Sequence, residues 1–389
     1  MNRLVYVFAA AAAFVALATY GSGIEKWDPA MAANGAEVDE SGVKWIDGRN
    51  MPIEGRAYDD VEAFYDRLPA GVTTNVNGGV RSMKHHTAGM QLRFTTDSDF
   101  VAVKFVNYNA SRGMYHMPEL GASGIDIYRQ DDATGKWRFV KSSHNCQTKK
   151  LDSGETARIV RAPWKKGEAC LVNLPLYNGI SRLWIGVAKD AKIGPPPSHR
   201  SGVVKPVVFY GTSITHGGCA SRAGLAFPSI IGRNLDVPIV NLGFSGSGVM
   251  EFEMSEHIAR IDASCYVLDC LWNMSAKAQK GRPGRSFEEN YEKFIRNLRA
   301  KRPDVPIVMA EQSDVYKKGR FDEINGMQKA LYEKLVAEGW KNLVYLPADD
   351  MFDDSLEGTV DGCHPNDLGM VTMAKAYGRA VAKALNLRK

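Results

Sequence analysis

The chain has 389 residues, enough for two domains that each bury their own core. Its content of 44% hydrophobic and 24% charged residues is ordinary for a globular protein and excludes wholesale disorder. The net charge of +5 is small for this length and the basic residues are scattered, so we expect no nucleic-acid partner.

Residues 1–23 have the pattern of a signal peptide. Arg3 precedes an apolar, alanine-rich stretch, Leu4–Ala18, that is too short to span a bilayer comfortably. Small residues follow, and Ala16–Ala18 is the expected cleavage zone. No cysteine follows it, so a lipoprotein anchor is not indicated. We expect an exported protein, periplasmic or secreted, with no stable membrane insertion after signal removal; an uncleaved anchor is the alternative.

Residues 40–193 carry short alternating or apolar runs broken by turn residues, with no helical pattern between them. The runs are Met90–Phe94, Phe100–Val106, Gly124–Tyr128, Trp137–Val140, Ala157–Val160 and Leu183–Val187. Such runs predict an all-β, antiparallel sandwich domain, jelly-roll-like in architecture. Pro195–Pro197 then stiffens a linker at residues 194–202.

Residues 203–389 alternate strand and helix patterns. Apolar strand candidates are Val207–Tyr210, Ile239–Leu242, Tyr266–Leu271, Ile307–Ala310 and Leu343–Leu346. Ser286 and Glu289 form a capping-box pattern that opens one helix. A last helix runs from about Asn366 to the C-terminus, with an apolar stripe of Val371, Ala374, Tyr377, Val381 and Leu385. These βα units predict a doubly wound, mostly parallel five-stranded α/β sheet of flavodoxin-like type.

Polar or glycine-bearing segments follow four of these strands. Ser213 follows the first strand, residues 241–246 the second and Asn273 the third, whereas Asp361 and His364 lie in the long loop after the fifth. Ligands of open α/β sheets bind beyond the carboxyl ends of the strands, so these segments are expected to converge on one edge.

A serine, an imidazole and a carboxylate are the groups that acyl transfer requires. We expect Ser213 to be the nucleophile, His364 the general base and Asp361 the residue that orients it. Donors for the oxyanion are expected from the backbone N–H groups of Ser213 and Gly246 and from the side-chain amide of Asn273.

Three further residues are candidate substrate contacts. Trp272, beside Asn273, is expected to form a pocket wall, with a core position as the alternative. His216 either lines the pocket or caps a turn. Arg222 either anchors an anionic substrate group or forms a structural ion pair, and the ion pair is favoured.

No cofactor or metal is expected. His85 and His86 are adjacent, but no H-E-x-x-H pattern or nearby carboxylate cluster supports a metal site, so hydrogen bonding within the sandwich is favoured. Cys219 and Cys363 each lie close in sequence to a catalytic candidate, and in an exported chain they are candidates for a disulfide.

The motifs resemble those of the SGNH (GDSL-like) hydrolases. G-T-S-I at 211–214 is similar to the first block of that family, N-L-G-F-S-G at 241–246 to the second, W-N at 272–273 to the third and D-G-C-H-P at 361–365 to the fifth. G-I-D-I-Y at 124–128 resembles the G-x-D-L-Y element of a β-domain that precedes a subset of these esterases. Thr212 departs from the usual aspartate, and Trp272 stands where a glycine or proline is more common.

The sequence therefore predicts a serine esterase that removes short acyl groups, O-acetyl above all, from a small-molecule or glycan ester. A lipase or thioesterase acting on longer chains is the first alternative, although no amphipathic lid is evident. A carbohydrate-binding protein that has lost activity is the second, and the intact set of site residues argues against it.

Overall fold

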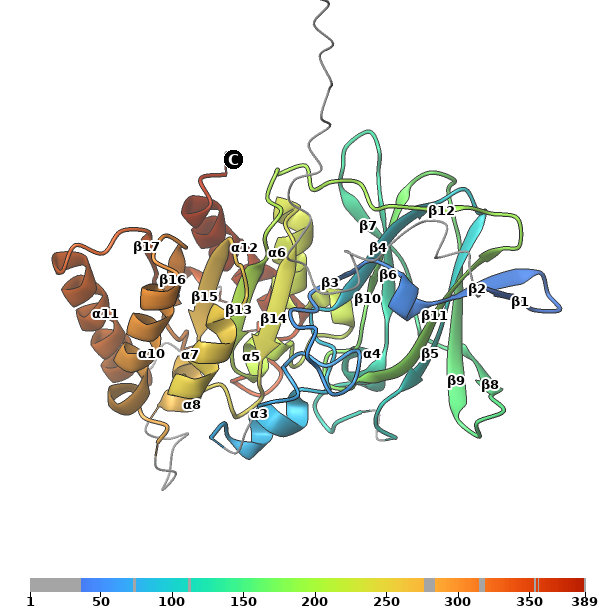
Figure 1. Ribbon diagram of the computed structural model, residues 1–389. Coiled ribbons are helices and arrows are strands. Elements are labelled where there is room, and N and C mark those ends of the chain that lie inside the picture. The colour runs from blue at the N-terminus through green and yellow to red at the C-terminus, as the bar shows by residue number, and fades with distance from the viewer. Residues whose placement is uncertain are drawn as a thin grey trace, which may run out of the picture.

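The computed structural model describes residues 36–72, 75–110, 113–275, 284–314, 319–352, 355 and 357–387. An antiparallel β-sandwich and an α/β domain lie side by side (Figure 1). The signal peptide expected at residues 1–23 lies outside the described residues. Within the described ranges, no helix combines the length and the apolar character that a membrane crossing requires.

The first sheet of the sandwich has six antiparallel strands in the order β1-β2-β11-β5-β9-β8. They are β1 (Glu37–Val38), β2 (Val43–Asp47), β5 (Phe100–Asn107), β8 (Gln147–Lys150), β9 (Thr156–Pro163) and β11 (Ile180–Ala188). In the centre of the sheet, Val103 pairs with Val160 on one side and Ile185 on the other. Side chains alternate along a strand, so these three residues point together into the core.

The second sheet has the order β12-β4-β10-β6-β7, with β3 also paired to β4. Its strands are β3 (Ile53–Glu54), β4 (Gln91–Thr96), β6 (Asp126–Gln130), β7 (Trp137–Ser142), β10 (Ala169–Asn173) and β12 (Ile193–Gly194). Phe94, Ile127 and Val172 from this sheet share one apolar core with residues of the first sheet. The predicted sandwich is confirmed. Short helices η1 (Gly48–Asn50), α3 (Gly78–Met83) and α4 (Glu119–Ser123) lie in its connections.

The α/β domain contains five parallel strands in the order β14-β13-β15-β16-β17. They are β13 (Val207–Gly211), β14 (Ile239–Gly243), β15 (Cys265–Asp269), β16 (Ile307–Ala310) and β17 (Leu343–Leu346). Residues of the three strands β13, β14 and β15 are all buried, as expected for a sheet covered on both faces. The predicted doubly wound sheet is confirmed.

Helices cover both faces of this sheet. They are α5 (Ser213–His216), η2 (Ala223–Leu225), α6 (Phe227–Leu235), α7 (Phe252–Ala259), α8 (Leu271–Met274), α10 (Phe287–Lys301), α11 (Asp322–Ala337), η3 (Ala348–Asp350) and α12 (Asp367–Ala384). Helices α7, α10 and α11 pack into one core on one face. Helices α6 and α12 pack into another core on the opposite face.

Local expectations hold with two exceptions. The capping box at Ser286 and Glu289 opens α10 as predicted. Strand β15 ends at Asp269, so Leu271, expected in the strand, lies instead in α8. In α12, Val371 is 36% exposed, because the buried face of the helix is centred on residues such as Met370 and Met373.

The two domains share their interior. Tyr58, Leu68 and Val80 of the N-terminal half pack into the same apolar core as α7 and α10. The guanidinium of the buried Arg67 donates hydrogen bonds to the main-chain carbonyls of Asn241 (3.1 Å) and Gly243 (2.8 Å) in β14. The N-terminal half covers this edge strand, and Arg67 supplies hydrogen bonds to the two carbonyls that would otherwise be buried without a partner.

The linker is held to both domains by a chain of charged groups. His199 contacts the Glu54 carboxylate of the sandwich at 3.1 Å and the Asp236 carboxylate of the α/β domain at 3.2 Å. Arg93 lies 2.6 Å from Glu54. Burial opposes ionisation of Glu54, but Arg93 and His199 outweigh it and lower the pKa of Glu54 to about 2.

Candidate active site

Ser213 stands at the point where a buried strand turns into a helix. Strand β13 ends at Gly211, and Thr212 caps α5 by accepting a 3.2 Å hydrogen bond from the N–H of Ile214. Ser213 is then the first residue of the helix and is 5% exposed. The helix ends after one turn at Gly217, whose φ of 111° lies in the left-handed region that glycine favours. This short turn fixes the Ser213 hydroxyl at the carboxyl edge of the sheet.

The structure brings Ser213, His364 and Asp361 together. Nε2 of His364 lies 3.0 Å from Oγ of Ser213, and Nδ1 lies 2.8 Å from Oδ2 of Asp361. The segments that carry them are tied to each other, because the N–H of Cys219 donates to the carbonyl of Pro365 at 2.9 Å. The arrangement places a hydroxyl, an imidazole and a carboxylate in one hydrogen-bonded line.

Asp361 is held as a carboxylate. Its Oδ1 accepts hydrogen bonds from the backbone N–H groups of Cys363 (2.9 Å) and His364 (2.8 Å). Burial favours the neutral acid, but these bonds and the His364 ring outweigh it and lower the pKa of Asp361 below its ordinary value of 3.8. The carboxylate therefore fixes both the ring and the backbone of the loop that bears it.

Three hydrogen-bond donors belong to the same edge. As the first residue of α5, Ser213 has a backbone N–H with no acceptor inside its helix. Gly246 follows β14 with a left-handed φ of 63° and has open space where a Cβ would lie. Asn273, in α8, donates one amide hydrogen to the carbonyl of Gly248 at 3.2 Å, which leaves its second amide hydrogen for another acceptor.

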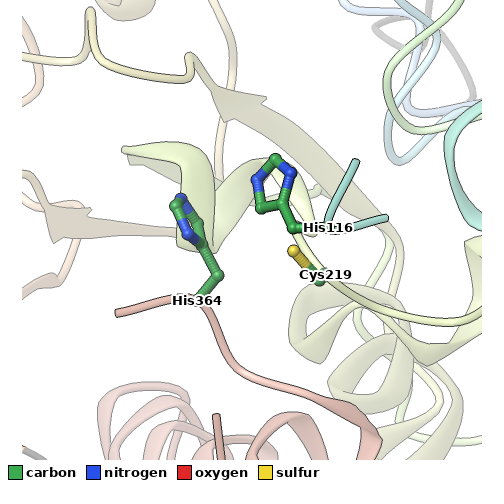
Figure 2. Close-up of side chains that lie close together, drawn as sticks. All are labelled: His116, Cys219 and His364. Carbon is green, nitrogen blue, oxygen red and sulfur yellow. The ribbon is translucent and has the colours of Figure 1, made fainter. Parts of the chain in front are cut away.

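The sandwich domain contributes side chains that sequence analysis did not find. The hydroxyl of Tyr177 donates to the carbonyl of Ser213 at 3.1 Å. His116 lies in the loop before α4, and its ring centroid is 5.2 Å from that of His364 (Figure 2). Burial and the nearby His364 lower the pKa of His116. Neither residue belongs to a local motif, and only the docking of the two domains brings them to Ser213 and His364.

His216 is fully buried and has no surface to offer a substrate. Its ring stacks on Tyr177 with a centroid distance of 4.1 Å, and its Nε2 lies 3.3 Å from Nδ1 of His86. Burial, with the charge of Arg67 and with His86, lowers the pKa of His216 far below 6.5. These contacts place the residue in the packing between the domains and do not support the pocket-lining alternative.

Arg222 makes the structural ion pair that was favoured for it. Its guanidinium donates to the buried carboxylate of Asp126 at 2.8 Å and to the hydroxyl of Tyr128. It also lies over the Phe139 ring at 4.1 Å. These contacts occupy the charged group, so the substrate-binding alternative is not supported.

Trp272 is partly exposed and contacts side chains from both cores of the α/β domain. Its ring lies 4.9 Å from that of Phe321, and the guanidinium of Arg320 lies 4.4 Å from its centroid. A position beside Asn273 with a partly open face is compatible with the expected pocket wall.

The six cysteines are free thiols in the structure, Cys219 and Cys363 included, so the bridge considered from the sequence is not formed. Burial and the negative charge of Asp361 raise the pKa of both thiols to about 12. Each is therefore a neutral thiol at neutral pH and does not compete with Ser213 as a nucleophile.

A buried acid supports the helix that begins with Ser213. Asp269, at the end of β15, accepts hydrogen bonds from the hydroxyls of Thr215 (2.6 Å) and Tyr377 (2.8 Å). Burial raises the pKa of Asp269 to about 6, and the two hydrogen bonds offset part of that rise. The sequence offered a signal for it, since an aspartate at the end of an apolar strand needs partners when it is buried.

The adjacent histidines have separate partners. His85 lies 2.7 Å from the Asp66 carboxylate, and His86 contacts His216. Burial, with the charges of Arg67 and His85, lowers the pKa of His86 to about 3. Glu62, Asp66 and His85 form a group that can hold a cation, but Glu62 already pairs with Lys84 at 2.6 Å.

Two family models match the chain. Residues 204–382 match the GDSL-like lipase/acylhydrolase family. Residues 43–193 match the N-terminal domain of SGNH-hydrolase-type esterases that is named for the G-x-D-L-Y element. A search of curated proteins found no match.

Solved structures share the fold over most of the chain. A protein described as a GDSL-like lipase from Bacteroides ovatus is 29% identical, with a TM-score of 0.74 over 89% of this chain and 99% of that one. A salicylyl-acyltransferase from a tetracycline biosynthetic pathway is 18% identical, with a TM-score of 0.64 over 92% of this chain and 95% of that one. A family two carbohydrate esterase from Clostridium thermocellum, in complex with cellohexaose, is 12% identical. Its TM-score is 0.55 over 77% of this chain and 94% of that one.

Proposed function

The chain belongs to the GDSL-like lipase/acylhydrolase family of carboxylic ester hydrolases, and we propose that it is an exported serine esterase that removes short acyl groups, acetyl above all, from carbohydrate. The observation that carries the proposal is the hydrogen-bonded line from Ser213 through His364 to Asp361. Export rests on the signal-peptide pattern of residues 1–23.

The proposed reaction begins with attack of Ser213 Oγ on the ester carbonyl carbon. Nε2 of His364 takes the hydroxyl proton as the C–O bond forms, and Asp361 stabilises the resulting imidazolium. Collapse of the tetrahedral intermediate breaks the bond to the alcohol, which leaves with the proton from His364. Water then attacks the acyl-enzyme by the same route and releases the carboxylic acid and free Ser213.

The negative charge that develops on the carbonyl oxygen needs donors already in place. We assign this role to the N–H groups of Ser213 and Gly246 and to the free amide hydrogen of Asn273. The left-handed φ of Gly246 supports the assignment, because it turns the backbone where a non-glycine residue would cost roughly 1–2 kcal/mol. The contact of Asn273 with Gly248 keeps the amide from rotating.

In this proposal residues 203–389 carry the chemistry, residues 40–193 complete the rim of the site, and residues 194–202 join them. A carbohydrate substrate is supported by Tyr115, which is 96% exposed and stacks on His116 at 4.3 Å beside His364. An exposed aromatic face next to the reacting groups suits a sugar ring. The carbohydrate esterase from Clostridium thermocellum shares the fold, which is consistent with this choice.

The nucleophile is tested with Ser213→Ala. The variant should fold as the wild type does and lose ester hydrolysis, and it should no longer react with a fluorophosphonate probe. Ser245→Ala is the matched control, since Ser245 lies in the loop that carries Gly246, and it should still be labelled. Labelling of Ser213→Ala at another serine would refute the assignment.

The substrate class is tested with an acyl series on one alcohol, followed by acetylated sugars. A site of acetyl size excludes longer acyl groups sterically, so kcat/KM should fall steeply beyond about four carbons. A profile that rises through octanoyl esters would point instead to a lipase or thioesterase. Glycan binding with no turnover of any ester would point to an inactive binding protein.

A further inference from the structure

We propose that His116, Cys219 and His364 form a site that takes up a thiophilic divalent cation, zinc above all, and that the bound ion switches the esterase off. Figure 2 shows the three side chains meeting from three separate segments: the loop before α4, the loop after α5 and the loop before α12. One ligand atom of each residue lies within 4.8 Å of those of the other two. The binding step stands on this geometry, whereas the inhibition rests on the proposed function.

The donor set selects the ion. Two imidazole nitrogens and one sulfur match the ligands that zinc prefers, whereas magnesium and calcium prefer oxygen. Zinc–nitrogen distances of about 2.0–2.1 Å and a zinc–sulfur distance of about 2.3 Å place the donors of a tetrahedral site roughly 3.5 Å apart. The three side chains therefore need to close by at most about an ångström, and a water completes the fourth position.

No hydrogen bond from the described residues holds the Nδ1 side of the His116 ring. Its Nδ1 is buried and has no hydrogen-bond partner among the described residues. Buried polar atoms are rarely left unpaired, and the His116 ring gives up no hydrogen bond at Nδ1 when it turns toward an ion. Two other groups among the described residues could hold a cation, but each includes a carboxylate that is already paired. They are Asp361–Cys363–His364 and Glu62–Asp66–His85.

His364 connects the site to the reaction. Asp361 binds its Nδ1, which leaves the lone pair of Nε2 facing Ser213 at 3.0 Å. In a metal-ligating histidine, the N–H of the other ring nitrogen commonly donates a hydrogen bond to a carboxylate in this way. A cation on Nε2 occupies the lone pair that must accept the Ser213 proton, and the Cys219 thiol releases one proton to solvent as it coordinates.

Cobalt(II) tests binding without any turnover. Coordination by a thiolate gives a sulfur-to-cobalt charge-transfer absorption in the near ultraviolet, and we expect it in the wild type at one equivalent. Ser213→Ala should retain this absorption, since its Oγ no longer competes for Nε2. Cys219→Ser and His116→Ala should lose or weaken it, whereas Cys363→Ser should keep it.

Inhibition is then measured by titrating zinc into an assay of short-ester hydrolysis. The rate of each protein is expressed relative to the rate of the same protein in the presence of chelator. Wild-type inhibition should be reversed by EDTA, and His116→Ala should need at least about tenfold more zinc for half-inhibition. His144→Ala, which removes an exposed histidine, is the matched control and should titrate as the wild type does.

Absence of the cobalt absorption in the wild type, or its loss in Cys363→Ser but not in Cys219→Ser, would overturn the site. Equal zinc sensitivity of His116→Ala and the wild type would also overturn it. If Ser213→Ala binds cobalt while no ester is hydrolysed by the wild type, the metal site stands and the proposed esterase function fails.

Discussion

Asp126 in the β-sandwich accepts a 2.8 Å hydrogen bond from the guanidinium of Arg222, which lies in the segment after α5. The same carboxylate accepts the N–H of Gly224 at 2.9 Å. Asp126 and Tyr128 are the acidic and aromatic members of the G-I-D-I-Y element, and both bind Arg222. The element therefore ties the sandwich to the loop that follows Ser213.

Asp126→Ala should lower the free energy of unfolding by about 3–5 kcal/mol, because it removes the acceptor of the mostly buried Arg222 guanidinium and of the Gly224 N–H. Chemical denaturation measures the loss. Asp152→Ala, the same change at an exposed position, should stay within about 0.5 kcal/mol of the wild type. Equal losses in the two variants would show that the Arg222 contact contributes nothing.

Asn273→Ala should reduce kcat by roughly 10²–10³ with little change in KM, since the proposed donor acts mainly in the transition state. Asn290→Ala is the matched control: its amide also donates to main-chain carbonyls nearby, those of Val249 and Gly284. It should show no comparable loss of kcat. A change confined to KM in Asn273→Ala would place this residue in substrate binding instead.

Asp269 should make the protein less stable as the pH rises. Its folded pKa of about 6 exceeds the ordinary value of 3.8, so the folded state holds this proton more tightly than the unfolded state. The stability that it contributes is full below about pH 4 and falls by about 3 kcal/mol up to about pH 6, at about 1.4 kcal/mol per pKa unit.

The measurement compares the wild type with Asp269→Asn, which cannot titrate at this position. The free energy of unfolding of the wild type minus that of the variant should decrease between pH 4 and pH 6.5. Asp190→Asn, at an exposed position, should follow the wild type. A difference between wild type and Asp269→Asn that stays constant across this range would contradict the raised pKa.

Deletion of residues 40–193 should leave an insoluble and inactive α/β domain. The deletion removes Tyr58, Leu68 and Val80 from the core around α7 and α10, and it uncovers apolar surface that a free domain would bury by aggregation. Expression of the truncated chain, followed by fractionation and ester assay, tests this. A soluble and active fragment would show that the α/β domain needs the sandwich neither to fold nor to hydrolyse esters.

The sequence predicted the fold and the meeting of Ser213, His364 and Asp361 because the underlying signals are local. Strand runs such as Ile307–Ala310 and the Ser286 capping box are encoded within a few neighbouring residues. Topology then brings the strand ends together, which is how Ser213 and His364 could be paired across 151 positions.

What the sequence did not predict depends on how the domains dock. Tyr177 and His116 lie in ordinary loop segments, and their relation to Ser213 and His364 exists only in the assembled chain. The sequence leaves the role of His216 open for the same reason: no residue near it in the chain indicates that Tyr177 and His86 will bury it. Periodicity reports which face of an element is buried but not what covers it.

The bonds of Arg67 to β14 also constrain the order in which the chain can mature during synthesis. Its acceptors in Asn241 and Gly243 lie 174 and 176 positions further along. At about 5–20 residues per second, the ribosome adds them roughly 10–35 seconds after Arg67 itself. Without these two acceptors, burial of the guanidinium would cost several kcal/mol, so this face of the sandwich can dock only once both are present. The polypeptide therefore reaches its final state only after translation has passed the second strand of the α/β half.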